Sequence, residues 1–130
     1  MTGARAAALF STIAVGAAGV GLMGGAVAGA KTTSVGIGER EFRIAVYRKH
    51  ILPGTVRFNI SNYGEDAHDL RVIGPGSTGP LRGTSPEIKA DAEYTLKVKM
   101  KKRGLYKLVC TLADHESRGM VSYVRVVKKL

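Results

Sequence analysis

The sequence has a single cysteine, Cys110, among its 130 residues, so the chain cannot form an internal disulfide. It also lacks a convincing amphipathic helical pattern and any internal repeat, which leaves short strands as the expected elements. Acidic residues are scarce, with 10 Asp and Glu against 20 Lys and Arg and a net charge of +10. This excess suggests an acidic partner or an anionic surface, but most of these charges are interpreted as a solvated basic face that keeps the protein soluble. The lack of a motif with stacking aromatics argues against nucleic acid.

The first thirty residues carry a single charge, at Arg5. Residues 6–30 are apolar or small and end in two small-x-small sites, A-V-A and A-G-A. A positive start, an apolar middle and such an ending are typical of a secretory signal peptide. The stretch is also long enough to span a bilayer, so residues 1–30 are interpreted as a signal peptide or an N-terminal membrane anchor. In either case we expect residues 31–130 to form one domain outside the cytoplasm, in the periplasm or cell envelope.

Apolar and polar residues alternate over several stretches, as they do in strands with one buried face. Strands are expected at 35–37, 42–46, 56–60, 70–73, 94–100, 105–110 and 121–127. Gly and Pro mark turns between them, and the Gly-, Pro- and Ser-rich segment 74–92 is predicted to be a long surface loop. The pattern predicts an all-β fold, an antiparallel Greek-key β-sandwich of about seven to eight strands.

The most informative segment reads Cys110-x4-His115-x4-Met120 and lies between two apolar strand-like runs. It is expected to form a loop at one end of the sandwich. Each residue alone has an ordinary structural explanation, but thiolate, imidazole and thioether in this order are ligands suited to copper. A second imidazole would complete a trigonal His2Cys site with a distant axial Met, and His68, at the start of a strand, is the candidate. The remaining histidine, His50, sits beside a turn and is interpreted as a surface residue.

The segment 104–120, G-L-Y-K-L-V-C-T-L-A-D-H-E-S-R-G-M, resembles the C-terminal signature of the cupredoxins, the family of plastocyanin, azurin and rusticyanin. The stretch 56–70 resembles the part of that family that supplies the first histidine ligand. The resemblance covers most of residues 40–128. It implies a cupredoxin-like domain with one type 1 copper ion and four ligands: His68, Cys110, His115 and Met120.

One position departs from the family pattern. Many members have Asn directly after the first histidine, where it braces the cysteine loop, and this chain has Asp69 there. An ionised carboxylate accepts hydrogen bonds but donates none. We hypothesise that Asp69 favours the oxidised, more positive ion and thereby lowers the reduction potential.

The resemblance implies an electron carrier whose copper cycles between Cu(I) and Cu(II). It would carry electrons between redox partner proteins, and acidic partners are expected among them. An envelope copper carrier or sequestration protein with the same ligands is the alternative. No enzymatic activity is expected, because copper saturated by protein ligands lacks the open position that catalysis uses, and three histidines are too few for a second cluster. The basic run 97–103 is interpreted either as a docking site for an acidic partner or as a solvated strand face, and we expect a monomer.

Overall fold

The computed structural model describes residues 24–25, 29 and 31–130, so the predicted signal peptide or anchor lies almost entirely outside the described residues. Residues 32–126 form nine strands and no helix. The strands are β1 (Thr32–Arg40), β2 (Arg43–Val46), β3 (His50–Ile51), β4 (Gly54–Asn62), β5 (Arg71–Ile73), β6 (Leu81–Thr84), β7 (Glu93–Met100), β8 (Gly104–Val109) and β9 (Val121–Val126). The described part of the chain contains no helix long and apolar enough to cross a membrane.

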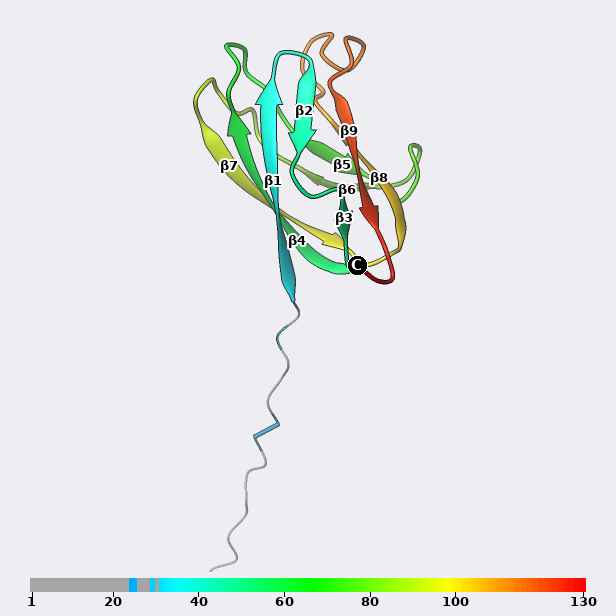
Figure 1. The fold of residues 1–130 in the computed structure, drawn as a ribbon. Helices are drawn as coiled ribbons and strands as arrows, with labels where there is room; N and C mark the ends of the chain where they lie inside the picture. Colours follow the sequence, from blue (N-terminus) through cyan, green and yellow to red (C-terminus); the bar gives the residue numbers. More distant parts are fainter. Residues whose placement is uncertain (1–23, 26–28, 30) are drawn as a thin grey trace, which may run out of the picture.

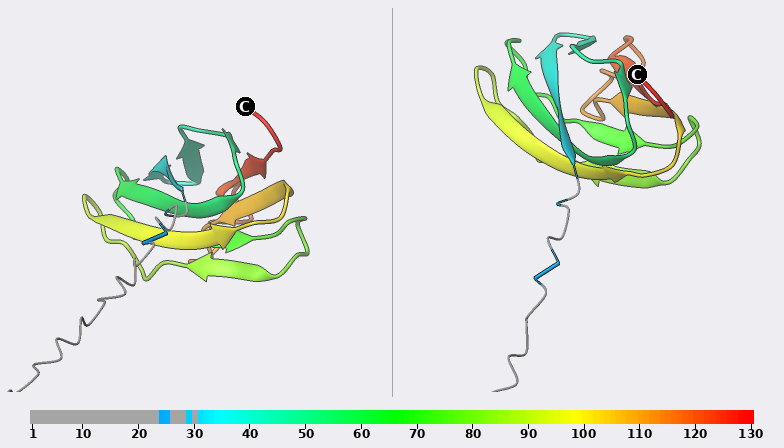
Figure 2. Two further views of the ribbon diagram at one scale, coloured as in Figure 1. Left: turned by 90° about the horizontal axis from the view of Figure 1, so that it is seen from below. Right: turned by 60° about the horizontal axis from the view of Figure 1, so that its bottom comes forward.

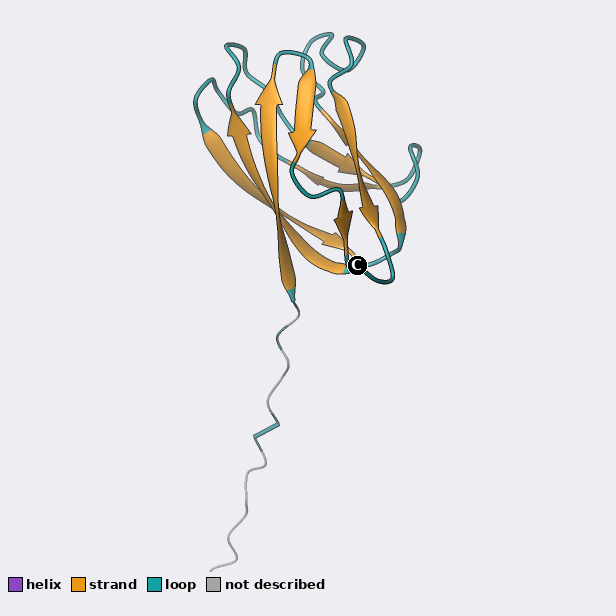
Figure 3. Cartoon of the chain, viewed as in Figure 1, coloured by secondary structure: helices purple, strands orange, loops and turns teal. Residues whose placement is uncertain are grey.

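The strands form two sheets, shown in Figures 1 and 3. One has the order β2-β1-β4-β7 and the other β3-β9-β8-β5-β6. The all-β sandwich is confirmed, but its strands are not all antiparallel, because β1 pairs with β4 and β3 with β9 in parallel. The reason is the course of the chain between β1 and β4. It turns back along β2, crosses to the edge of the other sheet as β3, and returns beside β1 in the original direction.

The predicted alternation places one face of β4 in the core. Val56, Phe58 and Ile60 are buried, whereas Arg57 between them is exposed. Phe58 on one sheet and Tyr106 on the other are the two largest fully buried side chains. The core therefore fills the space between the sheets, and Tyr106 packs there.

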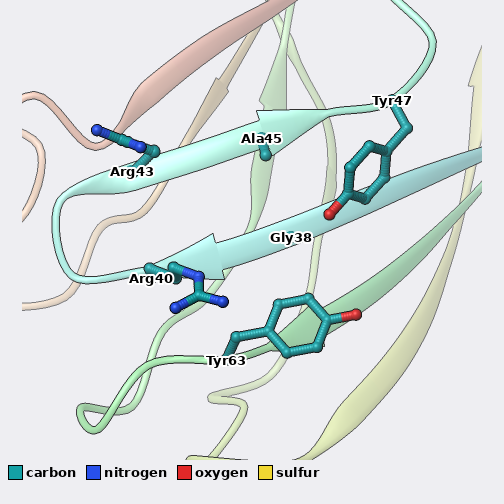
Figure 4. Close-up of a pocket in the computed structure, with 6 residues that line it drawn as sticks. All are labelled: Gly38, Arg40, Arg43, Ala45, Tyr47 and Tyr63. Carbon is teal, nitrogen blue, oxygen red and sulfur yellow. The ribbon is translucent and has the colours of Figure 1, made fainter.

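Nine strands replace the seven to eight expected, and one of them, β6, lies within the predicted 74–92 loop. β6 is an edge strand whose residues are all exposed or half-buried, so it carries no alternation to recognise. β1 is longer than the strand expected at 35–37. The sequence pattern did not show its full length because Gly36 and Gly38 interrupt the alternation. Tyr47 requires these glycines: a Cβ at Gly36 would lie 2.7 Å from Tyr47 Cδ2, and Figure 4 shows the Tyr47 ring beside Gly38.

Most of the loops gather at two opposite ends of the molecule, whereas the loop 74–80 lies at its side (Figure 1). The upper end in Figure 1 comprises the turn 41–42 and the loops 63–70, 85–92 and 110–120. The lower end, which comes forward in Figure 2, comprises residue 31, residues 52–53, the turn 101–103 and residues 127–130. Strand register fixes this division, since Ser61 pairs with Glu93 at the upper end and Gly54 pairs with Met100 at the lower end.

Candidate metal centre

Two histidines and the cysteine meet at the upper end. His68 lies in the loop after β4, Cys110 directly follows β8, and His115 lies in the loop between β8 and β9. Their donor atoms all lie within 4.8 Å of one another. Cys110 Sγ is 3.5 Å from His115 Nδ1 and 4.0 Å from His68 Nδ1, and the two Nδ1 atoms are 3.2 Å apart. His68 and Cys110 are fully buried, and His115 is 7% exposed.

These separations fit a single metal ion. Bonds of about 2.3 Å to sulfur and about 2.0 Å to nitrogen, spread in a plane, place sulfur about 3.7 Å from each nitrogen and the nitrogens about 3.5 Å apart. The observed 3.5, 4.0 and 3.2 Å lie close to those values. Two imidazoles and a thiol form a donor set for the softer transition metals. The structure thus brings together three of the four residues predicted as ligands in a geometry that suits a metal.

Met120, the fourth predicted ligand, directly precedes β9 and is fully buried. Its backbone is joined to the cluster: Cys110 N–H donates to Met120 O at 3.2 Å, and Met120 N–H donates to His115 O at 3.0 Å. The two hydrogen bonds place Met120 next to the cluster at the base of its loop. Its role as a ligand stays a prediction.

The loop 110–120 folds back on itself, as ligand residues so close in sequence require. His115 N–H donates to Leu112 O at 3.1 Å, and Gly119 N–H donates to Glu116 O at 2.9 Å. Gly119 has a φ of 98°, a left-handed conformation that glycine adopts without strain. The loop is therefore a run of tight turns that presents His115 to Cys110.

Asp69 braces this loop from the neighbouring segment. Its Oδ1 accepts a hydrogen bond of 2.6 Å from Thr111 N–H, and its Oδ2 accepts one of 2.5 Å from the Thr111 hydroxyl. Both partners are donors, so an ionised carboxylate satisfies them fully. Asp69 thus keeps the brace that the family pattern assigns to Asn. Next to it, His68 exchanges two backbone hydrogen bonds with Ile88, of 3.0 and 2.7 Å.

Glu41, in the turn between β1 and β2, is a site residue that the sequence analysis missed. Its Oε1 lies 3.5 Å from His68 Nε2, the ring nitrogen that does not face the cluster and that has no hydrogen-bond partner among the described residues. Oε1 accepts hydrogen bonds from the backbone N–H groups of Asp66 at 2.9 Å and Glu65 at 2.7 Å, which lower the pKa of Glu41 to about 2. Gly64 leaves room for this carboxylate, since a Cβ there would overlap Oε1. A carboxylate facing the outer nitrogen of a histidine fixes the orientation of its ring in metal sites.

Phe42, also in this turn, covers His115. Its ring meets that of His115 edge-on, with centroids 5.5 Å apart, and the Arg118 guanidinium lies 4.7 Å from the centre of the Phe42 ring. The alternation with Ile44 and Val46 had placed Phe42 in a strand. In the structure Phe42 has a φ of 58° and belongs to the turn that precedes β2.

Burial affects the protonation of two members of the cluster, Cys110 and His68. It raises the pKa of the Cys110 thiol to about 11, although the backbone N–H groups of Asp69 and Leu112 act in the opposite direction. Burial also lowers the pKa of His68, and the neighbouring His115 lowers it further. Cys110 must lose its proton to act as a ligand, so metal binding at this site releases a proton and strengthens as the pH rises.

Two other features lie outside the centre. His50 is exposed on β3, where it pairs with Arg125 of β9, and its interpretation as a surface residue is confirmed. A hollow of about 300 Å³ lies outside the sandwich, beside β1 and β2 (Figure 4). It is lined by Gly38, Arg40, Arg43, Ala45, Tyr47 and Tyr63. It contains none of the predicted ligands.

No protein-family model and no curated protein matches the sequence. Solved structures do match. Auracyanin A, a blue copper protein from Chloroflexus aurantiacus, matches with a TM-score of 0.59 and 17% identity over 75% of this chain and 100% of its own. Rusticyanin from Thiobacillus ferrooxidans matches with a TM-score of 0.62 and 16% identity over 75% of this chain and 78% of its own. A copper-containing nitrite reductase from Thermus scotoductus matches with a TM-score of 0.56 and 13% identity over 75% of this chain but 31% of its own.

At these identities the similarity concerns the fold. It extends over nearly the whole of the small blue copper protein and over one part of the larger enzyme. Together with the two sheets and the His-Cys-His cluster at one end of them, these matches show that the chain has the cupredoxin fold, the fold of blue copper proteins.

Proposed function

We propose that this chain is a type 1 copper protein that carries single electrons between partner proteins outside the cytoplasm. The observation that carries the proposal is the buried cluster of His68, Cys110 and His115 at one end of a cupredoxin fold. Met120 is proposed as the weak axial ligand. Copper, when bound, supplies reversible exchange of one electron between Cu(I) and Cu(II).

The protein's part is to hold the donor atoms in one arrangement. Hydrogen bonds with Ile88 fix the backbone of His68, and Asp69 fixes the segment that follows Cys110. Donor groups that are held by their surroundings move little when the charge at the site changes. Little reorganisation is the physical requirement for fast electron transfer, so the bracing supports a carrier.

Electrons are proposed to enter and leave at His115. Among the three clustered donors it is the one with exposed surface, 7%, whereas the other two have none. Phe42 packs against its ring and Leu112 is half-buried beside the core, so water has little access. A redox partner that docks over this edge of the upper end comes closest to the cluster.

Two further parts of the proposal are export from the cytoplasm and a role as electron carrier rather than enzyme. Export rests on the apolar character of residues 6–30 and the small-residue sites that end them. A role as electron carrier rather than enzyme is supported by the extent of the fold matches, which cover 100% of the blue copper protein auracyanin A but 31% of the nitrite reductase.

The test is to express residues 31–130, add Cu(II), and record the optical spectrum and a voltammogram. We expect an intense blue charge-transfer band and a reversible one-electron wave. Cys110→Ser should abolish the band because it removes the thiolate. His50→Gln is the matched control, since it removes an exposed histidine outside the cluster and should leave the spectrum unchanged. A wild-type domain that binds no copper, or binds it without a blue band, would reject the proposal.

Copper carriage with the same ligands is the competing function. A carrier must release its metal, whereas the three donors here are buried. We therefore expect slow loss of copper to a chelator of moderate affinity. Rapid and complete transfer to the chelator would favour carriage over electron transfer.

A further inference from the structure

All the acidic residues of this chain lie toward the upper end of the molecule. Each of the 10 lies in an upper loop, in the last residues of β1 or at the first residue of β7. They are Glu39, Glu41, Glu65, Asp66, Asp69, Glu87, Asp91, Glu93, Asp114 and Glu116. The upper end, which holds the metal centre, is therefore the end where the chain's acidic residues collect. Glu39 is buried and adds no charge to its surface.

The lower end has cations and no acidic side chain. Its basic residues are Lys31, Lys101, Lys102, Arg103, Lys128 and Lys129, with Lys99 of β7 beside them, and all are exposed. Register brings them together: Gly54 pairs with Met100 and Gly104 with Val126, so the turn 101–103 lies beside the start of β4 and the end of β9. Within the described chain none of these cations forms an ion pair. Their positive charge is therefore left uncompensated.

Some of these lysines surround a recess. A hollow of about 310 Å³ is lined by Arg82, Lys99, Lys101, Lys102 and Tyr106. Arg82 Nε–H donates to Gly74 O at 2.7 Å, and the buried Tyr106 donates its hydroxyl to Lys102 O at 2.8 Å, so two of the lining side chains are held in place. Four cations around one recess of this size suit an anionic group such as a phosphate.

Exposed leucines accompany the cations. Leu52 is 39% exposed, Leu105 36% and Leu130 71%, and all three belong to the segments that meet at the lower end. β1 also begins there, so the apolar residues 6–30 of the sequence join the domain at this end. An acidic protein would match the charge alone, whereas a lipid surface matches the charge, the leucines and the point where the apolar segment joins.

We propose that the lower end docks on an anionic membrane surface, with phosphate headgroups among its lysines and its leucines at the interface. The same negative surface repels the acidic upper end. The two effects orient the molecule with the metal centre facing away from the membrane, where a partner protein can reach it. This holds with residues 1–30 attached or removed, because the cations belong to the domain itself.

The test uses residues 31–130, which contain the whole core of the described part of the chain, from Val35 to Val126. Binding is measured by flotation with vesicles of phosphatidylcholine alone and of phosphatidylcholine and phosphatidylglycerol in equal parts. The lower-end variant is Lys101→Gln/Lys102→Gln/Lys128→Gln. The control variant is Arg57→Gln/Lys89→Gln/Lys97→Gln, which removes the same charge from exposed positions outside the lower end.

We expect wild type and control to bind the anionic vesicles and not the neutral ones, with binding that weakens as salt is added. The lower-end variant should bind about 100-fold more weakly, the equivalent of about 1 kcal/mol for each lysine at the membrane surface. Equal losses in both variants would overturn the proposal, because net charge and not the lower end would then be responsible. So would binding of wild type to polyglutamate without binding to anionic vesicles, which would assign the lower end to an acidic protein.

Discussion

Glu39 is a carboxylic acid enclosed in the sandwich without a partner, and its replacement by glutamine is expected to stabilise the domain. The side chain, on β1, is fully buried, and neither of its oxygens has a hydrogen-bond partner among the described residues. Burial raises the pKa of Glu39 to about 8, and the negative charge of Asp69 adds to the effect. An unpaired charge is costly to bury, so the folded protein retains this proton more tightly than the unfolded chain.

The sign of the pH dependence follows from the two pKa values. The folded value of about 8 lies above the ordinary 4.5, so the unfolded chain loses the proton first as the pH rises. Stability from protonated Glu39 is therefore complete below pH 4.5 and is lost as the pH rises to about 8. At 1.36 kcal/mol per pKa unit, the loss amounts to about 3 kcal/mol at neutral pH. Glutamine has a similar size and does not ionise. Glu39→Gln should therefore match wild type in acid and exceed its unfolding free energy by about 3 kcal/mol at neutral pH.

Urea denaturation of metal-free residues 31–130 across this pH range measures the difference. His68 titrates in the same range with the opposite sign, because burial lowers its pKa and its contribution to stability rises with pH. Subtracting the wild-type curve from that of Glu39→Gln removes the contribution of His68 and leaves that of Glu39. Glu87→Gln, at an exposed acidic position of the upper end, is the control and should follow wild type. If the wild-type and Glu39→Gln curves run parallel from acid to pH 8, the reasoning is wrong.

Glu41→Gln removes the negative charge that faces His68 Nε2, and we expect copper affinity in a competition titration to fall about tenfold with the fold unchanged. Asp69→Asn should retain the brace on the ligand loop and raise the reduction potential measured by voltammetry. An unchanged or lower potential would reject the charge argument. Tyr106→Phe removes one hydrogen bond, to Lys102 O, and should lower the unfolding free energy by about 1 kcal/mol without altering the optical spectrum.

The proximity of most of the predicted ligands could be foreseen because they lie in one short loop. Cys110, His115 and Met120 follow each other between two recognisable strands, so their proximity in space follows from local sequence. His68 is distant in sequence, and its place in the cluster rested on the family resemblance and the choice between few histidines. The structure brings its Nδ1 to 4.0 Å from Cys110 Sγ.

The surroundings of the cluster could not be predicted in the same way. Phe42 is apolar like Ile44 in the strand that follows, so the sequence does not distinguish the two. In the structure Phe42 differs because it has a positive φ and belongs to the turn before β2. Glu41 reaches His68 because β1 and β4 run in parallel, which brings the turn after β1 beside the loop after β4. That pairing depends on the course of the chain through β2 and β3, and no local pattern encodes it.

The cluster also connects the two sheets, which links metal binding to folding. His68 lies on the connection from β4 of one sheet to β5 of the other, whereas the loop 110–120 joins two strands of the second sheet. A ligand that binds only the folded arrangement of these segments stabilises it in proportion to RT ln(1 + [L]/Kd). A positive ion there also offsets the negative charge of Asp69, which in the metal-free protein contributes to the raised pKa of Glu39. A cation bound at the upper end would therefore stabilise the fold both through its ligands and through this charge. The lower end has cations without acidic side chains beside them, and we propose that these cations contact an anionic surface.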